Sequence, residues 1–361
     1  MTTFDVLIAG GGPAGCAAAI ALGLHAPELS ICIADAPRGD AVTLGETLPP
    51  PAAAMLKQLG VYESFVADGH ERSFRTVSAW GSAKPAANEF LGHVHQHGWR
   101  LDRPRFDAML RTRALETGAH WTHARITGLA QGDAGWTAQC DGDAPIAARF
   151  AIDATGRGAA LLRLLPHMPR PQTLDRLIAC IVHFENCASP HADTSVESFE
   201  DGWWFATGLP CGKRLVALMS DSDIVRRLRA ADPNVWHGRL QETQLARRLV
   251  QDGHPCGPPR LVPAGSRYQA APSGLPLLGA GDAASSFDPL SSQGIVKALR
   301  SGAFAAYAAA DFLKSGDARN LARYRAFVDG EFAAYRRTWR EHYRHEARWR
   351  ERAFWRRRFL D

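Results

Sequence analysis

Four short, mostly apolar runs stand out along the chain as predicted buried strands. They are FDVLIA (4–9), SICIA (30–34), AARFAI (147–152) and GLPLLGAG (274–281). Short apolar runs without regular polar alternation are typical of parallel strands that are covered on both faces. An alanine-rich stretch, CAAAIALGLH, follows the first run and favours a helix. The pattern predicts an α/β fold with a Rossmann-like domain.

The turn between the first strand and its helix reads GGGPAG (10–15). Gly10 allows a tight turn, Gly12 removes a side chain where a pyrophosphate approaches the backbone, and Gly15 allows close helix packing. Asp35, after the second run, is placed to accept hydrogen bonds from a ribose. Glycine turns are common, but strand, turn, helix and acid together predict an adenine dinucleotide site. Its predicted contacts are Gly10, Gly12, Pro13, Ala14, Gly15 and Asp35.

Two later strand ends indicate which dinucleotide binds. The third run continues into DATG (153–156), and the fourth ends in Gly281-Asp282. FAD has a ribityl chain whose hydroxyls need an acceptor, whereas an NAD dehydrogenase needs no second aspartate of this kind. FAD is therefore the predicted cofactor, and Asp153, Gly156, Gly281 and Asp282 are predicted contacts. The alternative for Asp282 is a turn or N-cap residue.

The segment DPLSSQGIVKAL (288–299) predicts a helix that begins beside the flavin. The chain turns at Pro289, and the helix starts at Ile295 with its positive end toward the flavin N1 and C2 carbonyl, where reduced flavin is anionic. Gly294 permits close approach of the backbone. The alternative is an ordinary proline and serine helix start. The candidates next to the reacting ring are Pro289, Ser291, Ser292, Gln293, Gly294 and Ile295.

Alternating positions predict a second, antiparallel sheet that forms a substrate domain. The alternation covers residues 71–81, 177–187, 194–210 and 214–221. Trp203, Trp204 and Phe205 either line a substrate pocket or fill the core of this sheet. The histidines His95, His97 and His183 are either bases or structural residues, so the pattern identifies no catalytic base.

Turn-rich segments at 46–52, 167–172 and 253–265 suggest how the chain divides. The predicted FAD-binding domain is discontinuous and comprises residues 1–70, 98–165 and 265–330. The predicted substrate domain comprises residues 71–97 and 166–264. Residues 331–361 are predicted to form a basic helical extension.

The C-terminal extension combines an aromatic stripe with a row of arginines. Phe332, Tyr335, Trp339 and Tyr343 recur every three or four residues, which predicts a helix that packs on the protein's own surface. The arginines are predicted to remain outside, and they suit an acidic protein surface better than nucleic acid, for which no motif is present. This predicted row is Arg336, Arg337, Arg340, Arg344 and Arg348.

Composition narrows the class of protein further. The 361 residues are 46% hydrophobic and 22% charged, with a net charge of +5, as expected for a globular domain without a membrane span. We expect a cytoplasmic protein. The seven cysteines form no CxxC pair, so we expect reduced thiols and no metal site. No second GxGxxG unit is present, so NAD(P)H must bind transiently or a flavin reductase must supply electrons.

The motifs together resemble the flavoprotein monooxygenase and flavin-dependent halogenase superfamily. The matching segments are GGGPAG, Asp35, WRLDRPRFDAML (99–110), DATG and GDAASSFDPLSSQG (281–294). The resemblance implies that Arg103 contacts the FAD phosphates, that Glu46 in GETLPP (45–50) lies at the cofactor, and that Asp282 binds the ribityl chain. The alternative for Arg103 is a solvated arginine at a helix start.

Halogenation is the close alternative, and the resemblance allows it to be tested on the sequence. Halogenases of this superfamily carry a lysine that captures hypohalous acid, a W-x-W-x-I-P motif and a glutamate after the proline. Here Arg75 aligns with the lysine, GWWFATGLP replaces the tryptophan motif, and Ser291 replaces the glutamate. Arginine is a poor nucleophile, so halogenation is disfavoured, although Lys84 lies nearby in the sequence.

The resemblance implies hydroxylation of an electron-rich aromatic ring by molecular oxygen through a flavin C4a-hydroperoxide. The segments GETLPP and DPLSSQG and the arginine-rich ending look most like flavoproteins that modify tryptophan in a partner protein during biogenesis of quinone cofactors such as cysteine tryptophylquinone. A small-molecule aromatic hydroxylase, a natural-product tailoring enzyme and a noncatalytic flavin-binding assembly factor remain alternatives.

Overall fold

The computed structural model describes residues 2–37, 47–90, 92–142, 144–188 and 193–359. Its first sheet has the strand order β8-β2-β1-β11-β10-β9, and β20 pairs with the end of β11. Strands β8, β2, β1, β11 and β20 are parallel, which confirms the predicted α/β fold class. The bounds are β1 Thr2–Ala9, β2 Ile31–Ala34, β8 His120–Thr122, β9 Ile126–Gly132, β10 Gly135–Cys140, β11 Ile146–Asp153 and β20 Leu277–Gly279.

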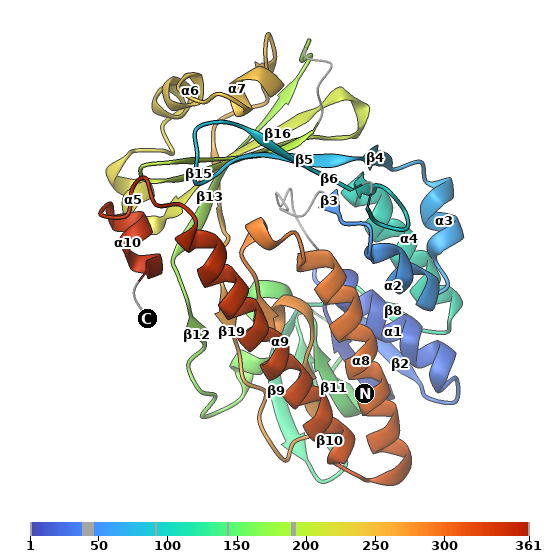
Figure 1. The fold of residues 1–361 in the computed structure, drawn as a ribbon. Helices are drawn as coiled ribbons and strands as arrows, with labels where there is room; N and C mark the ends of the chain where they lie inside the picture. Colours follow the sequence, from blue (N-terminus) through green and yellow to red (C-terminus); the bar gives the residue numbers. More distant parts are fainter. Residues whose placement is uncertain (1, 38–46, 91, 143, 189–192, 360–361) are drawn as a thin grey trace.

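Helices α1 (Pro13–His25), α4 (Arg103–Glu116) and α8 (Gly294–Ser315) pack together beside this sheet (Figure 1). The alanines of α1 are almost all buried because the helix lies between the sheet and α8. Small residues allow the two helices to touch. A side chain at Gly302 of α8 would come within 2.2 Å of the Ala14 carbonyl oxygen. The small residues of α1 thus place the starts of both helices next to each other.

The second sheet has the order β17-β13-β16-β15-β14-β5-β6, with β18 also paired to β13. Its pairs are antiparallel as predicted, except that β14 and β5 run parallel. The predicted single strand 194–210 is a hairpin, because the chain turns between Phe199 and Gly202. The bounds are β5 Arg75–Ala79, β6 Ala86–Glu89, β13 Leu177–Glu185, β14 Thr194–Phe199, β15 Gly202–Gly208, β16 Arg214–Asp221, β17 His254–Pro255 and β18 Arg260–Pro263.

Smaller elements surround the two sheets. Two short three-stranded sheets are formed by β3 (Thr47–Leu48), β7 (Gly98–Arg100) and β4 (Glu71–Ser73), and by β12 (Gln172–Thr173), β19 (Arg267–Tyr268) and β21 (Ser285–Ser286). The remaining helices before the C-terminal region are α2 Ala52–Gln58, α3 Tyr62–Ala67, α5 Ser222–Arg227, α6 Pro233–Gln241 and α7 Ala246–Leu249. Helices α6 and α7 lie at the end of the molecule that is farthest from the first sheet (Figure 1).

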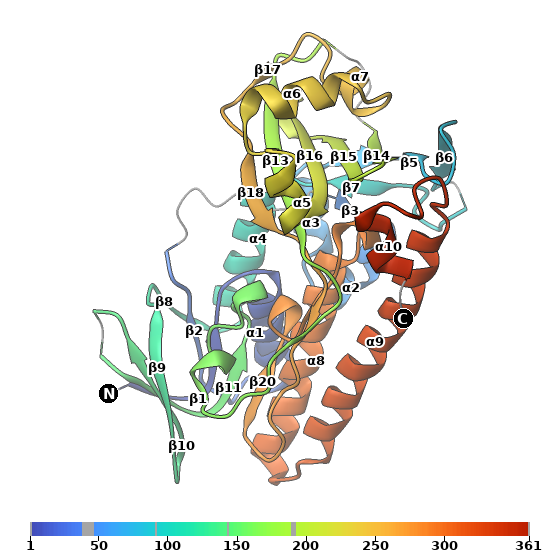
Figure 2. The same cartoon turned by 90° about the vertical axis from the view of Figure 1, so that its left-hand side faces the viewer.

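The C-terminal region consists of α9 (Arg319–Arg344) and α10 (Ala353–Phe359). Helix α9 runs beside α8 from the first sheet toward the second, in both views (Figures 1 and 2). The predicted aromatic stripe is confirmed, because Phe332, Tyr335, Trp339 and Tyr343 are all at least nine-tenths buried in the protein's own core. The predicted boundary at residue 331 falls inside α9, so the extension comprises the second half of this helix together with α10.

The sequence led us to expect no membrane span, no disulfide and no metal site, and the described residues can be examined for each. No helix in this part is long and apolar enough to cross a membrane. The described cysteine side chains form no disulfide, and no cluster of three or more described His, Cys, Asp or Glu side chains is arranged to hold a metal ion.

Candidate active site

A cavity of about 720 Å³ lies where the carboxyl ends of β1, β2 and β11 meet the underside of the second sheet. Its walls come from the start of α1, the start of α4, the turns after β11 and β20, and strands β15 and β18. In open α/β sheets the crevice outside the carboxyl ends of the strands is the usual ligand site. The cavity therefore gathers most of the residues that the motifs single out.

The glycine turn lies at one end of the cavity. Gly10, Gly12, Pro13, Ala14 and Asp35 line it, as predicted for dinucleotide contacts. Gly10 has φ +99, and a Cβ there would come within 2.5 Å of the Ala154 carbonyl oxygen, so only glycine fits. The Gly11 amide donates to Oδ1 of Asp35 at 2.8 Å, which ties the turn to the acid.

Gly15 lies behind the turn and outside the cavity lining. A Cβ on Gly15 would sit 1.9 Å from the Gly10 carbonyl oxygen. This glycine is needed for close packing of α1 on the turn, the role that the spacing predicts.

Arg103 is the first residue of α4 and lines the cavity. The preceding residue, Asp102, caps the helix by accepting a hydrogen bond from the Arg105 amide at 3.1 Å. The Arg103 side chain is only 10% exposed, and its guanidinium lies 3.3 Å from the Asp107 carboxylate. It is held against the cavity wall and is not the solvated arginine of the alternative interpretation.

Asp153 has a different position from the one predicted. It is fully buried, it does not line the cavity, and its carboxylate accepts hydrogen bonds from the Thr155 amide and hydroxyl and from the Leu162 amide at 2.6–2.9 Å. Burial raises the pKa of Asp153, although these hydrogen bonds oppose the rise. Asp153 thus shapes the turn after β11, while the next residues of the DATG segment, Ala154 to Gly156, line the cavity.

Asp282 lines the cavity and is held by two cations from other elements. The Lys297 ammonium lies 2.9 Å from Oδ1, and the Arg157 guanidinium lies 3.4 Å from Oδ2. Burial alone would raise the pKa of Asp282, but Lys297 and then Arg157 outweigh it and hold the pKa below its usual range. Gly281, just before it, does not line the cavity; it has φ +60 and packs on Ala14. The Gly281-Asp282 turn thus places one ionised carboxylate at the cavity.

Lys297 itself is almost completely buried, with its side chain 1% exposed. Its ammonium also donates to the Ser285 carbonyl oxygen and lies 4.6 Å from the centre of the Phe287 ring. Burial lowers the pKa of Lys297, and Asp282 opposes that change. A buried ammonium is stable only with such partners, so the lysine and the aspartate form one unit.

The segment Asp288–Gly294 is predicted to lie beside a flavin, and we call it the flavin loop for that reason. It borders the cavity at the start of α8. Pro289, Ser292, Gly294 and Ile295 line the cavity, as predicted. A Cβ on Gly294 would meet no atom within 4 Å, so the backbone faces open space. Ser291 and Gln293 do not line it: the Ser291 hydroxyl turns back to the Asp288 carbonyl oxygen at 2.8 Å, and Gln293 is the residue before α8.

The part of the cavity that the second sheet forms is apolar, and Phe205, Val262 and Pro263 line it. Phe287 also lines the cavity, close to Lys297. Trp203 and Trp204 do not line the cavity, and their positions agree with the alternative that they fill the core of the sheet. Successive strand residues point to opposite faces. Trp203 is buried and donates to the Tyr343 hydroxyl, whereas Trp204 packs against Trp236 on the other face, with ring centres 5.3 Å apart.

Several other candidates lie away from the cavity. His95, His97 and His183 do not line it, and Arg75 is paired instead with Asp193 and Glu89 on the second sheet. Lys84 is exposed. Among the residues that the structure describes, no lysine lines the cavity. Glu46 lies outside the described residues.

Four residues at or behind the cavity were missed by sequence reasoning. They are Arg157, Asp288, Lys297 and Tyr343. Asp288 and Lys297 are charged residues inside a mostly apolar segment, and this signal could have found them because a buried charge requires a partner. Arg157 and Tyr343 carry no such signal, since only the fold brings them to Asp282 and Asp288.

The sequence model of the tryptophan halogenase family matches residues 76–359, which is more than half of the chain. This chain belongs to the tryptophan halogenase family. Family membership identifies it as a flavin-dependent oxidoreductase, and FAD is its cofactor, as predicted.

Individual relatives agree in fold along nearly the whole chain. A putative FAD-dependent oxidoreductase, LodB from Marinomonas mediterranea, is 29% identical over 99% of this chain and 97% of the relative. The myxobacterial chondrochloren halogenase CndH is 17% identical, covers 100% of this chain and 87% of its own, and has a TM-score of 0.87. The peptidyl tryptophan dihydroxylase QhpG is 22% identical, with 99% and 79% covered and a TM-score of 0.75. These likenesses support the FAD-binding fold.

Proposed function

We propose that the protein is an FAD-dependent monooxygenase that hydroxylates an electron-rich aromatic ring. The observation that carries the proposal is the composition of one cavity. Its two ends differ: one has the glycine turn, Arg103 and the ionised Asp282, and the other has the apolar walls Phe205 and Val262. The first end suits a charged dinucleotide, and the second suits a flat apolar substrate.

The residues present fit FAD along the length of the cavity. Gly10, Gly12 and the first turn of α1 would hold the pyrophosphate together with Arg103, and Asp35 would bind the adenosine ribose. Asp282 would accept hydrogen bonds from the ribityl chain, and the amides of Gly294 and Ile295 would face the flavin ring. These contacts come from the predicted FAD-binding segments 1–70, 98–165 and 265–330, while Phe205 and Val262 belong to the predicted substrate domain.

Bound FAD supplies the capacity to activate molecular oxygen for transfer to the substrate. The chain's own residues stabilise negative charge and exclude water. The amides at the start of α8 stabilise negative charge by a few tenths to about 2 kcal/mol, depending on burial. Phe205, Val262, Pro263 and Phe287 exclude water from the ring that reacts. Electron-rich indoles and phenols need little further activation, in keeping with the absence of a described histidine from the lining.

A tryptophan side chain in a partner protein is the substrate that we propose. Two observations support it: the likeness of the whole chain to QhpG, and an uncompensated basic surface on α9. Arg336 and Arg337 are exposed and Arg340 is partly exposed, and no ion pair is found for any of them among the described residues. We call these three residues the basic face. An acidic partner surface would complement it.

The structure revises the predicted arginine row. Arg348 bonds to Glu346 and to the Ser198 hydroxyl, so it is part of the protein's own packing. Arg357 and Arg358 are likewise paired with acids of the second sheet and of α5. The docking hypothesis therefore concerns the basic face only.

Halogenation is the second candidate, because the matching family and several similar structures are halogenases. The lysine that such chemistry needs is absent from the described cavity lining, and Arg75 lies elsewhere. This arrangement favours oxygen transfer without halide.

The deciding experiment is co-expression with proteins encoded by neighbouring genes, followed by mass analysis of each partner. We expect added oxygen on a partner tryptophan and consumption of oxygen that depends on reduced FAD. Halogen on the product would favour the second candidate. Efficient hydroxylation of free tryptophan or a small phenol would favour a small-molecule or natural-product enzyme, and flavin binding without turnover would favour an assembly factor.

A further inference from the structure

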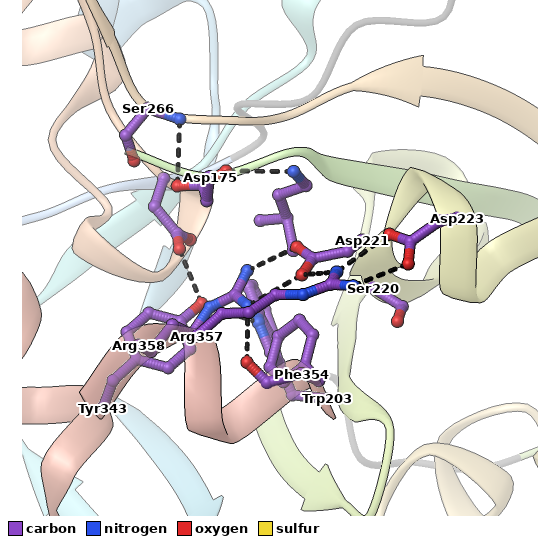
Figure 3. A network of polar contacts seen from close by, with 12 residues as sticks. Asp175, Trp203, Ser220, Asp221, Asp223, Ser266, Tyr343, Phe354, Arg357 and Arg358 are labelled. Carbon is purple, nitrogen blue, oxygen red and sulfur yellow. Dashed lines mark hydrogen bonds and ion pairs between the residues drawn. The ribbon is translucent and has the colours of Figure 1, made fainter. Parts of the chain in front are cut away.

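The C-terminal helices are attached firmly to the second sheet. Arg358 of α10 forms a two-point ion pair with Asp221 at the end of β16, with distances of 2.8 and 3.2 Å. Arg357 bonds to Asp221 and also to Asp223 at 2.7–2.8 Å. Figure 3 shows both guanidinium groups pointing toward Asp221. Two-point arginine–carboxylate pairs are directional, so α10 is fixed in orientation as well as in place.

A second attachment joins the end of α9 to the other strands of that sheet. Oε2 of the buried Glu346 accepts hydrogen bonds from the Ser198 hydroxyl at 2.6 Å and from the Gly81 amide at 2.8 Å. The indole of Trp355 donates to the Phe199 carbonyl oxygen at 2.9 Å. The C-terminal segment is therefore tied to the substrate-side sheet at several points.

Helix α9 also holds the flavin loop, through hydrogen bonds to Asp288. The Tyr343 hydroxyl donates to Oδ2 of Asp288 at 2.6 Å, and the Trp339 indole donates to the same oxygen at 3.2 Å. The Asp288 amide donates to the Tyr335 hydroxyl at 2.9 Å. The other carboxylate oxygen of Asp288 accepts from the Leu290 amide and starts the turn of the loop. Three consecutive aromatic residues of the α9 stripe thus determine where the loop begins.

Tyr343 also contacts the second sheet, through Trp203. Its hydroxyl accepts a hydrogen bond from the Trp203 indole at 3.0 Å. Trp203 lies on β15, two residues before Phe205, which lines the apolar end of the cavity. One buried hydroxyl therefore bridges the flavin loop and the strand that forms the wall opposite it.

We propose that Tyr343 is a positioning residue that sets the flavin loop at a fixed distance from β15. The proposal rests on the proposed assignment of residues 288–294 to the flavin. Without the hydroxyl, Asp288 and Trp203 would each lose a buried partner, and the loop would be free to shift relative to the wall of the cavity. Three other charged or titratable groups face Asp288, namely Asp175, Arg358 and Tyr335. None of them bonds to β15, so none can replace Tyr343 as the link between the loop and this strand.

Tyr343→Phe is the direct test, because it removes the hydroxyl and keeps the ring among its aromatic neighbours. Tyr324→Phe is the matched control. Tyr324 is a buried tyrosine of the same helix, and its hydroxyl donates to the Gly279 carbonyl oxygen at 2.7 Å, away from the flavin loop. Each change removes one hydroxyl that forms hydrogen bonds with buried groups. Both variants are therefore expected to be less stable, and a loss of stability alone does not test the positioning role.

The first measurement is amide hydrogen exchange of the protein without FAD. We expect residues 290–294 to exchange several-fold faster in Tyr343→Phe than in the wild type and in Tyr324→Phe. The second is the visible circular dichroism of the FAD-loaded protein, which we expect to change in Tyr343→Phe alone. Equal exchange and equal spectra in the two variants would overturn the positioning role.

Failure of the proposed function gives a different result, because a protein that binds FAD but hydroxylates no aromatic ring would still show the exchange difference and the spectral change. If Tyr343→Phe does not fold, Asp288→Asn serves in its place, because it keeps the shape of the side chain and weakens the same bond. Unchanged loop exchange in a folded Asp288→Asn protein would also contradict the proposal.

Discussion

Lys297 and Asp282 form an ion pair of 2.9 Å in which the lysine is 1% exposed and the aspartate faces the cavity. The two residues are fifteen positions apart, at the end of one strand and in the first turns of the next helix. Because the buried lysine has no water around it, its charge depends on Asp282, and the ionised state of Asp282 depends on the lysine in turn. With the proposed contact between Asp282 and FAD, the pair would link FAD binding to folding.

Lys297→Met should therefore reduce both stability and FAD affinity. Breaking a buried pair by removing one partner costs about 3 to 5 kcal/mol, and the partial exposure of Asp282 places the expected loss at the lower end. Thermal unfolding and FAD titration measure the two effects. Lys314→Met is the control, since Lys314 pairs with Glu28 on the surface. Unchanged FAD affinity in a folded Lys297→Met protein would show that the pair is only structural.

Asp282→Ala should weaken FAD binding by about 1 to 3 kcal/mol through loss of hydrogen bonds to the ribityl chain. The same substitution leaves Lys297 without its carboxylate, so unfolding must be measured in parallel. The double variant Asp282→Ala with Lys297→Met should recover part of the lost stability, but none of the lost affinity. Recovery of affinity would argue against a direct contact between Asp282 and the cofactor.

Gly12→Val should abolish FAD binding while the protein stays folded. Gly12 has φ −81 and ψ −173, an extended conformation that valine adopts without strain, and its side chain would project where the pyrophosphate is expected. Gly132→Val on the β9–β10 hairpin is the control, because a Cβ there meets no atom within 4 Å. A folded Gly12→Val protein with full flavin content would refute the dinucleotide assignment of this turn.

Asp288 should stabilise the folded protein more at acidic than at neutral pH, the reverse of an ion-paired carboxylate. Burial, and then the charge of Asp175, raise the pKa of Asp288 from 3.8 to about 6. Since the folded protein binds this proton more tightly than the unfolded chain, the contribution of Asp288 to stability rises as pH falls from about 7 to 4. The shift of about two units corresponds to about 3 kcal/mol.

Asp288→Asn should remove that contribution, because asparagine does not titrate. The measurement is the difference in unfolding free energy between wild type and variant at several pH values, which cancels the other titrating groups. The difference should change by up to about 3 kcal/mol between pH 7 and pH 4. A difference that stays constant across this range would mean that folding does not raise the pKa of Asp288.

Charge reversal of the basic face should weaken turnover on a protein partner. Arg336→Glu with Arg340→Glu should raise KM for the partner, and wild-type turnover should fall with added salt because exposed charges are screened. Reversal of Arg226 and Arg248, which are exposed on the outer helices, is the control. If both double variants behave like the wild type, the partner does not dock on α9. Deletion of residues 350–361 is unsuitable as a test, because it removes the Arg358–Asp221 pair.

Bromide or chloride should leave the product unchanged. With no lysine in the described cavity lining, halide in the assay should yield hydroxylated product only. Arg75→Lys should not introduce halogenation, since Arg75 is bound to Asp193 and Glu89 away from the cavity. Reproducible halogenated product, detected by its isotope pattern, would establish the second candidate function.

The sequence by itself determined the parts of this protein that depend on local spacing. The glycine turn, Asp35, the Gly281-Asp282 strand end and the α8 start are each set by a few neighbouring residues, and the aromatic stripe follows from helical periodicity. Each was therefore readable before the fold was known. Local spacing was insufficient for Asp153, which follows a buried strand as Asp35 does but is itself buried away from the cavity.

Only the tertiary structure decided which residues from distant segments meet. Lys297 reaches Asp282 because two elements converge at the carboxyl end of the sheet, and Tyr343 reaches both Asp288 and Trp203 because α9 packs between the flavin loop and the second sheet. Strand alternation turned Trp204 to the face opposite Phe205, whereas Trp203, on the same face as Phe205, is covered by Tyr343 of α9. These contacts depend on long-range packing, for which a single sequence has no periodic signal.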